Sequence, residues 1–75
     1  MSKGKLTAII EKDEDGYFAY CPELSGCHTQ GDSLDEAYMN LKEAVALYLD
    51  TLDFDEKCLI LNKEIFSTSI EVEVA

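Results

Sequence analysis

The sequence contains no arginine and no tryptophan, and it has only one proline and one histidine. Its basic residues are 6 lysines, set against 16 acidic residues, so the formal net charge is −10. Nucleic-acid binding depends on basic surfaces, in which arginine makes bidentate contacts to phosphates and guanines. We therefore expect no direct binding of nucleic acid, whereas the negative charge would attract a basic protein partner.

Long apolar runs are also missing. No run approaches the length of a membrane span, and residues 1–5 are not followed by an apolar stretch long enough for a secretory signal. The 3 cysteines are an odd number, which is typical of free thiols in a reducing compartment. We expect a cytoplasmic protein that makes no contact with a membrane.

Few residue combinations in the chain could support catalysis or bind a metal. Cys27 and His28 are adjacent in a predicted strand, so their side chains point to opposite faces and are poorly placed to share one ion. Cys21 could meet His28 across two strands, but a Cys–His hydrolase also needs an orienting group. The sequence therefore predicts no enzyme, no metal site and no cofactor.

Carboxylates near the first turn leave one enzymatic alternative open, a metal-dependent nuclease. Such an enzyme needs several carboxylates that converge on one site. An acidic hairpin tip is more often simply solvated. The residues concerned are Glu11, Asp13, Glu14, Asp15 and Glu23.

Hydrophobic periodicity predicts a β-hairpin followed by a third strand and a helix. Residues 5–12 alternate with period two, residues 17–21 are rich in aromatic residues typical of strands, and the Asp13–Gly16 turn separates the two runs. Pro22 ends the second strand because it cannot donate to a sheet ladder. Residues 27–30 form the third strand.

The predicted helix begins after Ser33, whose hydroxyl and the Glu36 carboxylate form an S-x-x-E capping box. Apolar residues then follow helical spacing to Thr51 or Leu52. Residues 53–67 show no clear period; within them, the apolar residues 58–61 could be a short strand, a patch packed on the sheet or an exposed contact surface. The last strand is predicted at 70–74, with three apolar residues facing the core: Ile70, Val72 and Val74.

This order is β-β-β-α-β, which corresponds to a two-layer α+β domain: an antiparallel sheet with one helix on one face. The 75 residues have room for a single domain, residues 1–75. A domain of this size buries little surface, and an open sheet edge would offer a place for pairing. We therefore expect a homodimer or a higher homo-oligomer.

A partner surface is predicted on the first two strands and their turn. Tyr17 and Tyr20 lie on opposite faces of one strand, so one of them faces away from the helix, where an aromatic side chain suggests a contact surface. The acidic turn would add charge attraction. The candidate partner-binding residues are Asp13, Glu14, Asp15, Tyr17, Tyr20 and His28.

Several short motifs occur in an order that resembles the HicB-like antitoxin family. They are D-G-Y at residues 15–17, P-x-L-x-G-C at 22–27 and G-D-S-x-x-E-A at 31–37, followed by Glu43-Ala44. The resemblance covers residues 5–52 well and the last strand loosely. It implies a fold likened to a degraded ribonuclease H domain that lacks the catalytic residues.

The resemblance also implies a function. HicB antitoxins bind HicA, a small basic ribonuclease that cleaves mRNA, and cover its active site. Many carry an additional DNA-binding domain, whereas this sequence resembles a short, stand-alone member, so repression of its own operon is not expected of it alone. The leading hypothesis is a non-catalytic antitoxin for a HicA-like toxin, and the alternative is an orphan homo-oligomeric scaffold with another partner.

Overall fold

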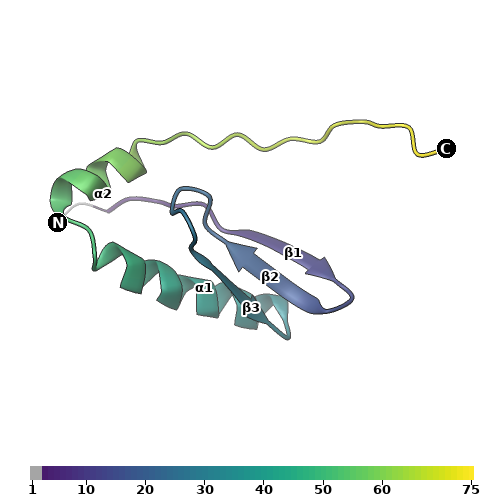
Figure 1. The fold of residues 1–75 in the computed structure, drawn as a ribbon, viewed down its shortest axis with the longest axis horizontal. Helices are drawn as coiled ribbons and strands as arrows, with labels where there is room; N and C mark the ends of the chain where they lie inside the picture. The colour runs from purple at the N-terminus through teal and green to yellow at the C-terminus, as the bar shows by residue number, and fades with distance from the viewer. Residues whose placement is uncertain (1–2) are drawn as a thin grey trace.

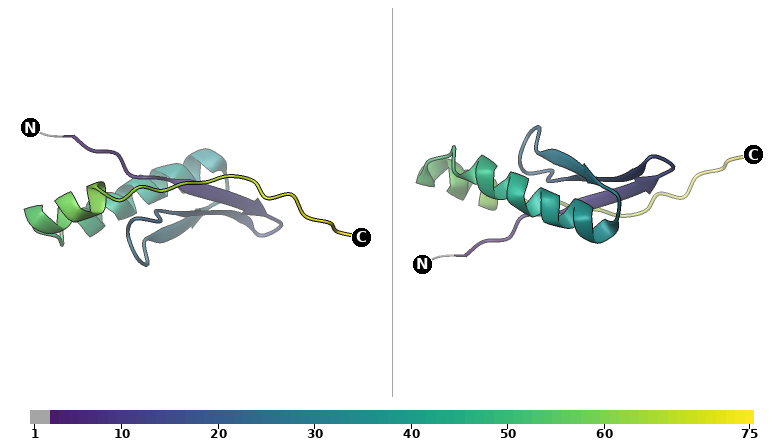
Figure 2. Two further views of the ribbon diagram at one scale, coloured as in Figure 1. Left: turned by 90° about the horizontal axis from the view of Figure 1, so that it is seen from above. Right: turned by 90° about the horizontal axis from the view of Figure 1, so that it is seen from below.

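The structure is a computed structural model that describes residues 3–75 (Figure 1). The strands are β1 (Ile9–Asp13), β2 (Gly16–Tyr20) and β3 (His28–Gly31), and the helices are α1 (Leu34–Leu49) and α2 (Phe54–Leu61). The strands form one antiparallel sheet in the order β1-β2-β3, and α1 packs on one of its faces (Figure 2). The predicted α+β class, with an antiparallel sheet and a helix on one face, is confirmed.

The β1–β2 hairpin pairs Ile9 with Tyr20 at one end and Asp13 with Gly16 at the other. Gly16 has φ of 125°, a conformation that side chains disfavour and glycine adopts readily. The Asp15 backbone N–H donates to the Asp13 carboxylate at 2.8 Å, which stabilises the turn locally. The turn at this place is confirmed.

The core lies between the sheet and α1, and it extends into the loop after β2. Its buried apolar residues are Ala19, Cys21, Leu24, Cys27, Ala37 and Leu41. This loop is closed by backbone bonds, among them one from the Cys21 N–H to the Cys27 carbonyl at 3.1 Å. Half of the buried apolar side chains thus come from a loop, which makes the loop a rigid part of the domain.

At the start of α1 the Ser33 half of the predicted capping box is confirmed, whereas the Glu36 carboxylate accepts from the Asp32 N–H at 3.2 Å and not from the Ser33 N–H. The Ser33 hydroxyl accepts from the Glu36 N–H at 3.0 Å. Gly31 lies so close to the first turn that a Cβ atom there would be 2.5 Å from the Ala37 backbone nitrogen. The helix ends at Leu49, slightly before the predicted end, because the Thr51 N–H turns back to the Tyr48 carbonyl at 3.0 Å.

The region after α1, for which the sequence left several readings open, contains the second helix. The Asp53 side chain accepts from the Glu56 N–H, and the Glu56 side chain accepts from the Asp53 N–H, which is a complete capping box. Cys58 to Leu61 are therefore helical and not a strand. The element order of the described residues becomes β-β-β-α-α.

The predicted last strand differs most from the structure. Residues 64–75 run extended but are not paired with the sheet, and they lead away from α2 (Figure 1). Ile70, Val72 and Val74 were expected to face the core, yet they are 83%, 69% and 93% exposed. The period-two pattern correctly indicates extended backbone, but the segment passes on the β1 side of the sheet without pairing with it.

Candidate functional site

The face of the sheet opposite α1 carries the candidate site. Strand register aligns Glu11 with Phe18, and Tyr20 with both Ile9 and His28, across this face. Because side chains alternate along a strand, Ala19 between Phe18 and Tyr20 points to the helix and is fully buried. This outer sheet face is therefore left open to a partner.

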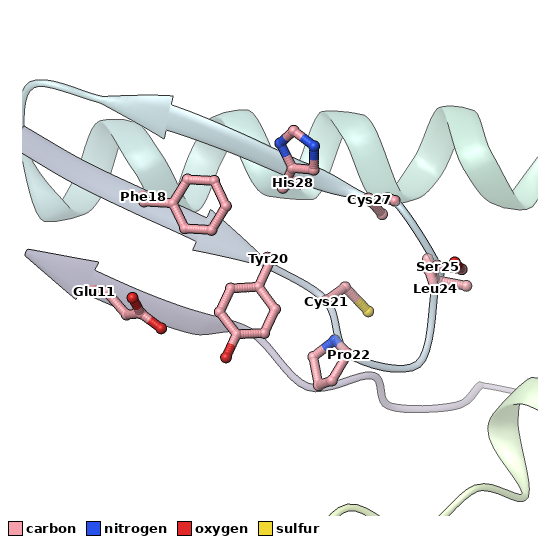
Figure 3. A pocket seen from close by; sticks show the side chains of 10 residues that line it. Glu11, Phe18, Tyr20, Cys21, Pro22, Leu24, Ser25, Cys27 and His28 are labelled. Atoms are coloured by element: carbon pink, nitrogen blue, oxygen red, sulfur yellow. The ribbon is translucent and has the colours of Figure 1, made fainter.

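Three rings gather on the outer sheet face (Figure 3). The ring centroids of Phe18 and Tyr20 are 5.8 Å apart, and those of Phe18 and His28 are 5.5 Å apart. These separations are typical of stabilising aromatic pairs. Phe18 and His28 are exposed and Tyr20 is half-buried, so the cluster offers apolar surface together with polar ring atoms to a partner.

A shallow hollow of about 400 Å³ lies beside these rings. One side is formed by Glu11, Phe18, Tyr20 and His28, and the other by the loop from Cys21 to Cys27 (Figure 3). Gly26 has φ of 78°, so the loop turns sharply where it returns to β3. A protruding side chain of a partner could enter here between the aromatic rings and the loop.

A buried carboxylate fixes this loop to the segment before β1. Glu23 is only 6% exposed, and its two oxygens accept the Thr7 N–H at 3.1 and 3.0 Å. The Thr7 hydroxyl donates to the same carboxylate at 2.9 Å, and the Cys21 thiol donates to it at 3.5 Å. Burial raises the pKa of Glu23, but these hydrogen bonds outweigh it, so the net pKa is below the ordinary value.

The structure brings only some of the predicted contact residues together. Tyr20 and His28 lie side by side, whereas Tyr17 lies on the α1 side of the sheet and packs against the core. The Lys12 ammonium is 5.6 Å from the centre of the Tyr17 ring. Tyr17 is therefore separated from the other two by the sheet itself.

The acidic turn forms a second part of the predicted surface. Asp13, Glu14 and Asp15 are all exposed, and they lie at the opposite end of the β1–β2 hairpin from Tyr20. Glu11 lies level with the rings, because it is paired with Phe18 across the strands. Acidic and aromatic side chains thus follow one another along the hairpin.

Phe18 is the residue of the site that the sequence analysis missed. The centroid of its ring is 5.8 Å from that of Tyr20 and 5.5 Å from that of His28. The sequence could have indicated it, because Phe18 is two positions before Tyr20 and therefore lies on the same face of the strand. Any partner that covers Tyr20 and His28 would also contact Phe18.

The cysteine thiols near the site are protected from reaction. Burial raises the pKa of Cys21, and the neighbouring Glu23 carboxylate raises it further. Burial also raises the pKa of Cys27. Both thiols therefore remain protonated at neutral pH, and a protonated thiol is a weak nucleophile. Among residues 3–75, no group of three or more histidine, cysteine and acidic side chains is arranged to hold a metal ion.

No helix within residues 3–75 has the length and apolar character needed to cross a membrane.

Comparisons with known proteins agree with the sequence motifs. A family model described as a HicB-like antitoxin of bacterial toxin-antitoxin systems matches residues 6–72. A UPF0150 protein of Helicobacter pylori strain J99 is 47% identical over 70 residues, which cover 93% of this chain and 97% of that protein. A UPF0150 protein of Archaeoglobus fulgidus is 55% identical over 47 residues, which cover 61% of this chain and 68% of that protein. No solved structure gives a significant match.

Proposed function

The chain belongs to the HicB-like antitoxin family, and we propose that it neutralises a small basic ribonuclease of the HicA type by covering the active site of that toxin. The protein acts by binding and not by catalysis. The observation that carries the proposal is the outer sheet face, where an open aromatic cluster lies next to exposed carboxylates on the same hairpin.

Electrostatic attraction would bring the two proteins together. The chain has a net charge of −10, and its exposed Asp13, Glu14 and Asp15 project from the tip of the hairpin. Complementary charge speeds diffusional encounter and disfavours partners of like charge, and salt weakens both effects. A basic RNA-binding surface has the complementary sign, so the same surface that binds RNA would bind the antitoxin.

The aromatic cluster would hold the complex once it has formed. Buried aromatic side chains contribute a large share of binding energy at protein interfaces, and a polar rim excludes water around them. Phe18 supplies apolar area, while Tyr20 and His28 add groups that hydrogen-bond at the edge. A toxin side chain placed in the adjoining hollow would be removed from solvent and from RNA.

The test compares charge reversals on two faces of the domain. The partner is the small basic protein that is recovered with the tagged chain from its native host at low salt. Lysine at Asp13, Glu14 and Asp15 together should weaken binding and flatten its dependence on salt. A matched triple reversal at three exposed acidic positions on or after α1 should have a much smaller effect: Asp35, Glu43 and Asp50.

A second variant tests the aromatic cluster separately. Phe18→Ser removes the ring that contacts both Tyr20 and His28, and it should weaken binding by about 30-fold or more while the salt dependence stays as in the wild type. Circular dichroism checks that the domain stays folded. Unchanged affinity in both the triple-lysine and the Phe18→Ser variants would show that the partner binds elsewhere.

A further inference from the structure

The extended segment, residues 64–75, has the pattern of a strand that is buried on one side, yet it is exposed throughout. Ile70, Val72 and Val74 alternate with Glu71 and Glu73. Such alternation is typical of a strand with one face in a core and the other in water. In the single chain, the apolar side of this strand has nothing to cover it.

The domain has an open edge of matching character. β1 pairs only with β2, so its other edge has free backbone N–H and carbonyl groups along the described strand. α1 packs mainly on β3 and β2 and reaches β1 much less, which leaves the inner side of β1 partly uncovered. A strand added at this edge would complete both the hydrogen bonds and the core.

An apolar groove of about 550 Å³ lies next to that edge, between the segment before β1 and α1. Its apolar lining includes Leu6, Ala8, Leu41, Val45, Leu49 and Leu61. A strand that pairs along β1 and continues beside residues 4–8 would direct every second side chain toward this groove. Residues 70–74 carry three apolar side chains at a spacing of two. These side chains would match the apolar lining of the groove.

We propose that the extended segment of one chain pairs with the open edge of β1 in a second copy, and that its apolar side chains fill the groove there. The extended segment passes on the β1 side of its own sheet, in the same direction as β1, without joining it, so this edge stays free for the segment of the second copy (Figures 1 and 2). A twofold axis makes the exchange reciprocal, so both segments and both edges are satisfied together.

The first test measures the mass of the full chain by sedimentation equilibrium. The wild type should have twice the chain mass, and Ile70→Lys/Val72→Lys should dissociate about 100-fold more readily. Both residues are exposed in the single chain, so the variant keeps its fold, which circular dichroism verifies. Glu71→Gln/Glu73→Gln changes the charge by the same amount and should remain dimeric. A monomeric wild type, or a double-lysine variant as dimeric as the control, would overturn the proposal.

The second test identifies which chain receives the segment. Isotope-filtered NOESY spectra of an equal mixture of 13C-labelled and unlabelled chains report only contacts between different chains. Contacts between the Val72 or Val74 methyl groups and Leu6 or Ile10 should appear in these spectra. If those contacts arise only within one chain, the segment folds back and the exchange is wrong. Neither test requires the toxin, so the result is independent of the proposed function.

Discussion

The buried Glu23 carboxylate allows a quantitative prediction, because its partners and its protonation can be changed separately. Glu23→Gln keeps the shape of the side chain but removes its charge and presents an amide N–H₂ where the carboxylate now accepts the Thr7 N–H. A hydrogen bond to a charged group contributes about 1.5–3 kcal/mol. We therefore expect Glu23→Gln to lower the free energy of unfolding by about 2 kcal/mol at pH 7.

The direction of the Glu23 pKa shift predicts how the stabilisation by this carboxylate changes with pH. Burial raises the pKa of Glu23 and the hydrogen bonds from Thr7 and Cys21 lower it, and the net pKa in the folded protein is below the ordinary value of 4.5. The unfolded chain therefore binds the proton more readily. The stabilisation is complete above about pH 4.5 and is lost as the pH falls through the folded pKa.

Urea unfolding at one protein concentration measures the free energy of unfolding of the wild type and of Glu23→Gln. The measurement is made at pH 7 and at steps below pH 4.5. The gap between wild type and Glu23→Gln should narrow on acidification. Thr7→Val removes only the hydroxyl donor and should cost about 1 kcal/mol. Glu14→Gln changes an exposed carboxylate and serves as the control, with an expected change within about 0.5 kcal/mol. If Glu23→Gln matches this control at pH 7, or if its gap widens in acid, the carboxylate does not hold the loop.

Two further predictions concern the backbone. Gly31→Ala places a Cβ atom 2.5 Å from the Ala37 nitrogen and should lower the free energy of unfolding by about 3 kcal/mol. Gly26→Ala has open space around its Cβ and should cost about 1 kcal/mol because of its positive φ. Equal losses in thermal unfolding would contradict the steric reasoning. Ser33→Ala removes the cap on the Glu36 N–H and should cost about 1 kcal/mol by urea unfolding, so an unchanged midpoint would show that the cap is dispensable.

The elements that sequence analysis located well are those with local signals. The hairpin has an alternating first strand and an aromatic-rich second strand on either side of the Gly16 turn, and α1 has both a serine N-cap and a long apolar stripe. The α2 helix was missed because only two turns follow its cap, which is too short for a helical period to be clear. The capping box from Asp53 to Glu56 was nevertheless visible in the sequence.

The last strand shows a different limit of sequence reasoning. The alternation at 70–74 correctly indicates extended backbone, but periodicity carries no information about which edge a strand joins, or in which chain. The site has the same limit. The pairing of Phe18 with Tyr20 follows from spacing along β2, whereas the contact of Phe18 with His28 depends on the β2–β3 register, which the loop from Cys21 to Cys27 sets.

The most direct test of the antitoxin function is the ribonuclease activity of the basic partner recovered with this chain. The partner alone should cleave RNA, and adding the purified chain should abolish cleavage in proportion to the molar ratio at low salt. The Phe18→Ser variant should inhibit much less, and raising the ionic strength should restore cleavage. A partner that does not cleave RNA, or one whose cleavage persists in excess wild-type chain, would contradict the proposed function.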